Sequence, residues 1–557
     1  MNRKQRRAQE KMAASGRPAG PSAALATANR LNDRALDEHR AGRSAEAIAL
    51  LREAIAAYPA NAIYHNNLGE LLRMSGDAAT ALPCFDQAIR LQPRYAQAHN
   101  NRGNALRDLK QPAEAVACYQ VALAIQPDYA EALNNMGAAL MDSRDFTGAA
   151  EALRKAIALN PGIAMFHQNL GLTLSSLDRP DEALRAFAEA VRLDPGLIDT
   201  QIALGDLARS QGDFAGTMRW YEQAIRLQPG HGAAHMRYGT ALMVKGDYKQ
   251  AWPHFGARWT VESMKVDMRP FTLPFWQGQP LPDGGKMLLF TEQGVGETLA
   301  LLSVMPELLA TGIRPVIECD PRMIPLLQRS FPGLEVLPRT NPAQPRLFAP
   351  DLVIQGSLFD VAAVFRRSPA DCTGALPLKA DAERAAALRA RYQQGDGRPL
   401  VGVAWYSANP QIGAPKSAHL TDFAAFLGLP GLQFVDLQYG NRAADRAALK
   451  QAAGVDLLVD PEIDQMKDLD GFAAQIEAMD MVVTTSNTTA HMAGALGKPA
   501  IVMLHKGISP HWYWGLDGNT TPWYRSLTLL RQTGPGDWAE VARRVAEQLS
   551  WRLPAAG

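Results

Sequence analysis

Six prolines recur at intervals of thirty-four residues in the first half of this chain: Pro59, Pro93, Pro127, Pro161, Pro195 and Pro229. Six glycines keep the same interval: Gly69, Gly103, Gly137, Gly171, Gly205 and Gly239. A fixed period of this length indicates that one small supersecondary unit is repeated and stacked along the chain. The period stops after Trp259, so the chain of 557 residues must contain a second kind of structure.

Each period predicts two amphipathic helices that pack together as a hairpin. In one copy the first helix covers residues 62–74 and the second covers residues 79–91. The proline ends the second helix because its ring cannot continue the hydrogen-bond ladder. This pattern is typical of tetratricopeptide repeats (TPRs), and we expect a superhelix of about six to seven repeats over residues 29–262. The charged, Ala/Gly/Pro-rich segment 1–28 is predicted to be a disordered basic tail.

An asparagine recurs two positions before the periodic glycine in four successive repeats: Asn67, Asn101, Asn135 and Asn169. An amide side chain can both donate to and accept from the backbone of an extended peptide. The array resembles the TPR superhelix of protein O-linked N-acetylglucosamine transferases, in which an asparagine ladder holds the substrate chain. The alternative is that these amides satisfy polar groups within the stack, which makes the array a scaffold.

Composition excludes several classes of partner and site. Lys and Arg total 57 and Asp and Glu total 56, so no net field attracts nucleic acid or an anionic membrane. No apolar run is long enough to span a bilayer. The four cysteines form no C-x-x-C pair, which argues against a disulfide framework and a zinc site and favours a cytoplasmic location.

The second half of the chain alternates short apolar runs with helical patterns, which predicts βαβ units and parallel sheets. The expected strands fall into two sets, one over 287–291, 315–319, 334–337 and 352–355, the other over 400–405, 433–438, 481–484, 500–504 and 527–530. We therefore expect two Rossmann-like lobes, over residues 275–395 and 396–552. Ligands in open α/β sheets bind beyond the carboxyl ends of the strands.

In each set, a polar motif follows the first expected strand, so there are two such motifs. In Gln293-Gly-Val-Gly-Glu297, glycines Gly294 and Gly296 allow a ligand to approach the backbone closely. Glu297 is either a catalytic carboxylate or a helix cap. The second motif is the polar loop that ends in Lys416 and Ser417, where the lysine suits a pyrophosphate or is a solvated surface residue.

A third motif follows the strand over 481–484 and comprises Ser486, Asn487, Thr488, Thr489 and His491. Hydroxyl and amide groups at a helix start can bind a phosphate, and they can also simply cap the helix. His491 alone would more often be structural. The aromatic loop 511–524 is either a lid that stacks on a ligand or ordinary packing.

These motifs, with Trp523, Tyr524 and Gln532 near the end, resemble the family 9 (heptosyltransferase-like) glycosyltransferase domain that bacteria fuse to TPRs. The resemblance covers roughly residues 275–532 and implies a GT-B fold. It also implies an inverting, metal-independent transfer of a sugar from a nucleotide-sugar, which is a co-substrate; no cofactor or metal is expected. Asp468-Leu-Asp470 does not contradict metal independence, because it is a single D-x-D sequence in a segment that is predicted to be helical.

The same resemblance assigns roles to residues of this chain. Glu297 falls where the family usually has an aspartate proposed as the general base. Lys416 and Ser417 fall on the segment that contacts the donor phosphates. The remaining donor-binding positions are Gln293, Gly294, Gly296, Ser486, Asn487, Thr488, Thr489 and His491. The chain departs from the family in two ways: Glu297 replaces the aspartate at the base position, which adds one methylene of reach, and Ser486 and Asn487 stand where Asp and Ser/Thr are common.

The combined expectation is a cytoplasmic glycosyltransferase whose TPR groove recruits a protein acceptor. The resemblance suggests flagellin or another surface protein as that acceptor. Two alternatives remain: transfer to a glycolipid or oligosaccharide, and a TPR interaction scaffold whose GT-B domain is inactive.

Overall fold

The computed structural model describes residues 21–374, 378–395, 397–408, 413, 416–506 and 511–552. The chain divides into two compact units, the first as far as Leu207 and the second from Ala208 onward. No helix among the described residues combines the length and apolar character that crossing a bilayer needs.

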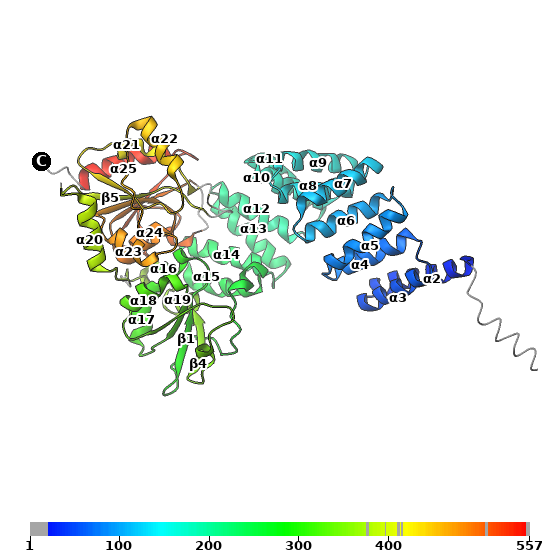
Figure 1. Ribbon diagram of the computed structural model, residues 1–557, viewed down its shortest axis with the longest axis horizontal. Coiled ribbons are helices and arrows are strands. Elements are labelled where there is room, and N and C mark those ends of the chain that lie inside the picture. Colours follow the sequence, from blue (N-terminus) through cyan, green and yellow to red (C-terminus); the bar gives the residue numbers. More distant parts are fainter. Residues whose placement is uncertain are drawn as a thin grey trace, which may run out of the picture. The chain divides into compact units, whose positions relative to one another are not determined.

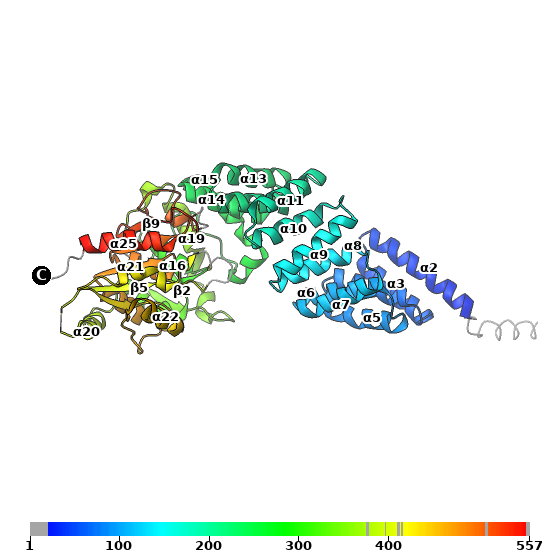
Figure 2. The ribbon, with the colours of Figure 1, turned by 90° about the horizontal axis from the view of Figure 1, so that it is seen from above.

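Within the described residues, fourteen helices precede the first strand, and they form an N-terminal TPR solenoid. Up to residue 193, successive helices pack as hairpins and each hairpin also packs on the next (Figure 1, blue to cyan; Figure 2). The helices are α2 (Pro21–Arg40), α3 (Ser44–Ala57), α4 (Ala62–Met74), α5 (Ala78–Leu91), α6 (Ala96–Asp108), α7 (Pro112–Ile125), α8 (Ala130–Asp142), α9 (Phe146–Leu159), α10 (Ala164–Ser176), α11 (Pro180–Leu193), α12 (Ile198–Ser210), α13 (Phe214–Leu227), α14 (Gly232–Lys245) and α15 (Tyr248–Phe255).

The beginning of the solenoid corrects one expectation. A disordered tail was expected over residues 1–28, but α2 begins at Pro21. Proline at the first position of a helix loses no hydrogen bond, and the Ala-rich sequence that follows favours helix. Residues 21–28 are therefore helical, and residues 1–20 lie outside the described part of the chain.

The periodic glycines lie where the two helices of a hairpin cross. A Cβ atom on Gly69 would lie 2.8 Å from the Phe85 ring, and one on Gly103 would lie 2.6 Å from the Tyr119 ring. The same contact recurs at Gly171, where a Cβ would lie 2.5 Å from Phe187. Only glycine fits such a crossing, because Phe187 is buried and cannot move aside.

We expect Gly171→Ala to lower the free energy of unfolding of the first unit by about 1–2 kcal/mol, because overpacking outweighs the helix preference of alanine. Gly162→Ala is the matched control, since the nearest atom to its Cβ would be 3.8 Å away. That control should be neutral or stabilising by up to ~1 kcal/mol. Urea unfolding followed by helical circular dichroism checks both, and equal effects of the two substitutions would refute the crossing argument.

The second unit contains two parallel sheets, as the sequence predicts. The first sheet has the order β3-β2-β1-β4 and the second the order β6-β5-β7-β8-β9. The strands are β1 (Lys286–Phe290), β2 (Val316–Cys319), β3 (Glu335–Pro338), β4 (Leu352–Ser357), β5 (Leu400–Ala404), β6 (Gln433–Asp436), β7 (Met481–Thr485), β8 (Ala500–Leu504) and β9 (Leu527–Arg531).

Helices cover both faces of the second sheet. One face packs on α21 (Ala424–Leu427), α22 (Ala443–Ala453) and α25 (Trp538–Arg552), and the other on α20 (Ala382–Gln393), α23 (Leu469–Glu477) and α24 (Thr488–Leu496) (Figure 1). Central strands buried on both faces are apolar throughout, and every residue of β5, β7 and β8 is buried.

One face of the first sheet packs on short helices, α16 (Val295–Leu301), α17 (Met305–Ala310), α18 (Ile324–Ser330) and α19 (Leu358–Phe365). The last helical hairpin joins the same core, because Trp252 of α15 donates from Nε1 to the carbonyl oxygen of Arg366 at 2.5 Å. Hence α14 and α15 form one packed body with the sheets of the second unit.

Candidate functional site

A pocket of about 200 Å³ lies in the second unit, beyond the carboxyl ends of β1, β5, β6, β7 and β8. Because parallel strands end at a common edge, residues distant in sequence meet there. The lining residues are Gly294, Val295, Gly296, Glu297, Ser407, Lys416, Tyr439, Ser486, Asn487, Thr488, His491, His511 and Tyr513.

The structure thus brings most residues of the three sequence motifs around one cavity. Gln293, Ser417 and Thr489 are not among the lining residues. Gln293 forms the turn after β1 with a left-handed φ of 62°. Ser417 supports the wall, because its Oγ accepts from the backbone N–H of Ser407 at 3.0 Å. Part of the polar loop before Lys416, residues 409–412 and 414–415, lies outside the described residues.

Five lining residues were not singled out individually from the sequence: Val295, Ser407, Tyr439, His511 and Tyr513. The aromatic loop 511–524 contributes both to packing and to the pocket. Trp512, Trp514 and Trp523 are buried and pack in the core, whereas His511 and Tyr513 line the pocket. The signal available for these two residues was their place in the segment between β8 and β9.

Glu297 lies in the first turn of α16, whose N-cap is Gly294. The helix start approaches α24 closely, since a Cβ on Gly296 would lie 3.0 Å from Cδ2 of His491. Burial, followed by the charge of Glu297, raises the pKa of Tyr513 well above its ordinary value. A carboxylate at a helix N-terminus is stabilised by the helix dipole, and this one also faces the cavity.

Lys416 is the cation of the pocket, and only 5% of it is exposed. Its Nζ lies 2.8 Å from Nε2 of His511. Burial lowers the pKa of Lys416 to about 8, while the charge of Glu297 acts in the opposite direction. The ammonium therefore persists at neutral pH but is lost more easily than that of a surface lysine.

The start of α24 presents polar groups to the pocket. Asn487 caps the helix, and its Oδ1 accepts from the backbone N–H of Thr489 at 3.0 Å and from the Thr484 hydroxyl at 2.9 Å. Ser486 accepts from Nε1 of Trp514 at 2.8 Å, so its hydroxyl is engaged in packing. Among the described residues, the buried hydroxyls of Thr485 and Thr489 have no hydrogen-bond partner.

His491 is buried against three aromatic rings, those of Tyr513, Trp514 and Tyr524. Its Nδ1 lies 2.9 Å from the Tyr524 hydroxyl. Burial, followed by the charge of Lys416, lowers the pKa of His491 to about 3. The imidazole is therefore neutral at pH 7, where it can take part in hydrogen bonds but adds no positive charge.

A buried ion pair supports the turn that carries Glu297. Arg258, which follows α15, binds Glu292 through two hydrogen bonds of 2.9 and 2.7 Å. The same guanidinium reaches Asp360 at 3.1 Å, and both Arg258 and Glu292 are almost fully buried. Glu292 lies five residues before Glu297, so the last helical hairpin anchors the start of the motif.

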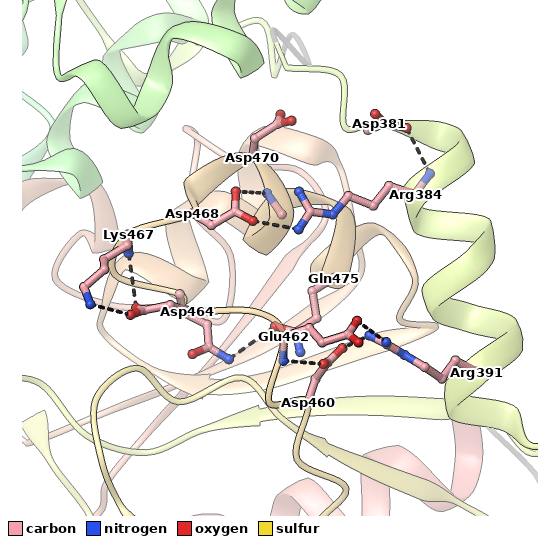
Figure 3. Close-up of polar contacts among 12 residues, drawn as sticks. Asp381, Arg384, Arg391, Asp460, Glu462, Asp464, Lys467, Asp468, Asp470 and Gln475 are labelled. Atoms are coloured by element: carbon pink, nitrogen blue, oxygen red, sulfur yellow. Dashed lines mark hydrogen bonds and ion pairs between the residues drawn. The ribbon is translucent and has the colours of Figure 1, made fainter.

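The D-x-D aspartates are engaged in ion pairs. Asp468 caps α23 and pairs with Arg384 of α20, while Asp470 pairs with Arg329 of α18. Figure 3 shows Asp468 facing Arg384 and, farther along α20, Arg391 facing Asp460 and Glu462. Within the residues that the structure describes, His, Cys, Asp and Glu form no cluster of three or more that could hold a metal ion.

The periodic asparagines of the first unit bond to the preceding repeat. Each Nδ2 donates to the Oδ1 of a second asparagine one repeat earlier. The pairs are Asn67 to Asn32 (2.9 Å), Asn101 to Asn66 (3.1 Å), Asn135 to Asn100 (3.0 Å) and Asn169 to Asn134 (2.8 Å). One N–H of each amide is thus used within the stack, and Nδ2 of Asn101 also donates to Glu70 at 3.5 Å, which leaves a second N–H on Asn67, Asn135 and Asn169.

Sequence models of the tetratricopeptide repeat match residues 32–82, 134–198 and 202–259, and two further TPR models match residues 84–117 and 103–143. Protein FlbA of Caulobacter vibrioides is 30% identical over 328 residues, which cover 56% of this chain and 54% of FlbA. The match therefore spans about half the length of that relative.

Two solved structures illustrate the repeats. YrrB, described as a TPR protein with an unusual peptide-binding site, is 25% identical, with a TM-score of 0.28 and coverage of 33% of this chain and 95% of YrrB. A tetratricopeptide repeat protein from Parabacteroides merdae is 19% identical, with a TM-score of 0.38 and coverage of 43% and 95%. The chain thus carries an N-terminal array of tetratricopeptide repeats.

Proposed function

We propose that this chain is a glycosyltransferase that moves a sugar from a nucleotide-sugar to a protein recruited by its TPRs. The two parallel sheets would act as the Rossmann-like lobes of a GT-B unit. Glu297 would take the proton of the acceptor hydroxyl as that oxygen attacks the anomeric carbon. Lys416 and the start of α24 would hold the diphosphate that leaves with the bonding electron pair.

The observation that carries this proposal is the composition of the pocket. A carboxylate at the end of a strand of one sheet faces a buried lysine and a helix N-terminus of the other sheet, across about 200 Å³. Asn487 and Thr488 at that helix start line the pocket, and the backbone N–H groups of a helix start can bind an anion.

TPR arrays bind peptides and proteins, and this array would bring the acceptor. The second N–H of Asn67, Asn135 and Asn169 remains for a peptide carbonyl, in keeping with a groove that binds backbone. We propose a protein acceptor, with flagellin or another surface protein as the first to test with a labelled nucleotide-sugar.

The test of the donor site uses the pH dependence of nucleotide binding. Because burial lowers the pKa of Lys416 to about 8, the ammonium is present below that pH and is lost above it. We expect the affinity for UDP, GDP or ADP, measured by calorimetry, to fall as the pH rises above about 8. A bound anion stabilises the ammonium, so the loss should begin somewhat above that value.

Lys416→Met should bind the same nucleotide at least about tenfold more weakly at pH 7, and its affinity should not change between pH 7 and 9. Lys450→Met removes an exposed lysine and should behave like the unmodified chain. If none of these nucleotides binds, the donor site does not exist and the chain is better described as a TPR interaction scaffold.

A further inference from the structure

His491 has one ring nitrogen that is bonded inside the protein and one that is open to a ligand. Its Nδ1 lies 2.9 Å from the Tyr524 hydroxyl oxygen. Among the described residues no group bonds to Nε2, although His491 is only 3% exposed and lines the pocket. Buried polar atoms are normally hydrogen-bonded, so an unbonded Nε2 beside a pocket indicates a place for a ligand atom.

The open edge of the imidazole lies against the turn that carries the proposed base. A Cβ atom on Gly296 would lie 3.0 Å from Cδ2 of His491 and 3.4 Å from Nε2, the two atoms of that edge. Gly296 directly precedes Glu297 in the chain. The absence of a side chain at Gly296 therefore leaves room for a ligand beside Nε2 and next to the carboxylate-bearing residue.

Neighbouring rings hold the imidazole in this orientation. The Tyr513 ring packs edge-on against His491 with 4.4 Å between the ring centroids, and the Trp514 ring is stacked on it at 5.2 Å. Both aromatic side chains are buried, so the space for the imidazole to turn over is filled. Nδ1 and Nε2 therefore keep their separate surroundings.

The Tyr524 hydroxyl determines which nitrogen of His491 carries the proton. Tyr524 is buried and is not among the residues that line the pocket, and within the described residues its hydroxyl bonds only to Nδ1. If Nδ1 donated, the phenol proton would be buried without an acceptor, which costs free energy. The favoured arrangement is the reverse: the hydroxyl donates to Nδ1, and the proton of the neutral ring stays on Nε2.

Both side chains have the charge that this arrangement requires. Burial, followed by the charge of Glu297, raises the pKa of Tyr524 well above its ordinary value, so the phenol keeps its proton. The imidazole is neutral at pH 7, because its pKa is lowered to about 3 by burial and then by the charge of Lys416. Nε2–H is therefore a hydrogen-bond donor without a positive charge.

We propose that His491 donates from Nε2 to a hydroxyl of the sugar in the nucleotide-sugar, and that Tyr524 is the positioning residue that sets its tautomer. The inference rests on the proposed function. The diphosphate is negative and suits Lys416, whereas the anomeric carbon must lie within reach of the oxygen that Glu297 deprotonates. Because Nε2 lies beside Gly296, it is placed at the sugar, not at the phosphates that the sequence motif suggests.

Nitrogen NMR of the histidine-labelled full chain tests the tautomer without any ligand. The His491 signals are those that disappear in His491→Phe. We expect the proton on Nε2 and an Nδ1 resonance typical of a nitrogen that accepts a hydrogen bond. In Tyr524→Phe, which keeps the ring that packs against Gly494, that resonance should move to the position of a non-bonded nitrogen. A proton on Nδ1 in the unmodified chain would overturn the role of Tyr524 and the donor at Nε2.

Calorimetry with UDP-glucose, GDP-mannose and ADP-glucose, and with UDP, GDP and ADP, tests the ligand atom. For the nucleotide that binds, His491→Phe should lower the affinity for the nucleotide-sugar about threefold to tenfold, the effect of one lost neutral hydrogen bond. The affinity for the diphosphate alone should change by less than about twofold, since Lys416 and the start of α24 remain.

A second variant keeps the histidine. Gly296→Ala should also weaken the nucleotide-sugar selectively, because its Cβ would take up the room beside Nε2. The matched control is Tyr392→Phe, which removes another buried hydroxyl, bonded to Asp460 away from the pocket, and should alter neither the His491 signals nor either affinity.

The outcomes separate the two proposals. If His491→Phe and Gly296→Ala weaken the diphosphate and the nucleotide-sugar equally, or weaken neither, the sugar contact is wrong while the donor site stands. A chain that binds none of the six ligands would overturn the proposed function, and the sugar contact with it.

Discussion

Glu297→Gln should reduce nucleotide release from the donor sugar by about 10²- to 10⁴-fold, the range that general base catalysis contributes. The amide keeps the size and the hydrogen-bonding capacity of the side chain but cannot accept a proton at neutral pH. Donor binding should be retained, because the diphosphate site is formed by Lys416 and the start of α24. Kinetics of nucleotide release and calorimetry of nucleotide binding measure the two effects separately.

Two further variants sharpen this result. Glu297→Asp shortens the side chain by one methylene but keeps a base, so it should retain more activity than the glutamine variant. Glu383→Gln removes an exposed carboxylate on α20 and should have no effect on rate. If Glu297→Gln released nucleotide at the unmodified rate with normal folding, Glu297 would not be the base.

The second large effect concerns stability. We expect Arg258→Met to lower the free energy of unfolding of the second unit by about 3–5 kcal/mol at pH 7 and above, because it leaves a buried carboxylate without its partner. Arg258 is only 2% exposed and Glu292 only 3%, so water cannot replace the lost hydrogen bonds. All ten tryptophans lie in the second unit, so urea unfolding followed by tryptophan fluorescence reports on that unit.

The destabilisation should depend on pH with a definite sign. Burial raises the pKa of Glu292, and Arg258 opposes that rise. Without the arginine the folded-state pKa lies far above the unfolded one, so the variant loses stability as the pH rises through the folded value. The defect should therefore be smaller at pH 5 than at pH 8. Arg367→Met, an exposed neighbour, should show neither effect, and a defect independent of pH would refute the unpaired-carboxylate explanation.

The sheets were predictable because central parallel strands are continuous apolar runs. The run 500–504 matches β8 at both ends, and the run 481–484 misses only Thr485 of β7. The position of the pocket was predictable for the same reason, because polar motifs that directly follow such runs meet at one edge of the sheet. Sequence reasoning reached Glu297, Lys416 and His491 in this way.

What the sequence could not reveal are partners fixed only by folding. Arg258 sits in a short 3-10 turn with no periodic pattern, and nothing in the sequence pairs it with Glu292. The contacts of His511 with Lys416 and Tyr513 depend on how the segment after β8 returns to the pocket. The asparagine period was visible, but its acceptors on the preceding repeat were not.

The asparagine pairs also bear on how such an array can change in length. A central repeat offers an acceptor, such as Asn100, to the following unit and a donor, such as Asn101, to the preceding one. A duplicated copy inserted beside it would find both partners, and no buried amide would be left unbonded. Toward the end of the first unit a different pair joins neighbouring repeats: the Thr200 hydroxyl donates to Oε1 of Gln168, in place of an asparagine pair. Gene duplication can therefore lengthen the solenoid in its asparagine-bearing part at little cost in stability.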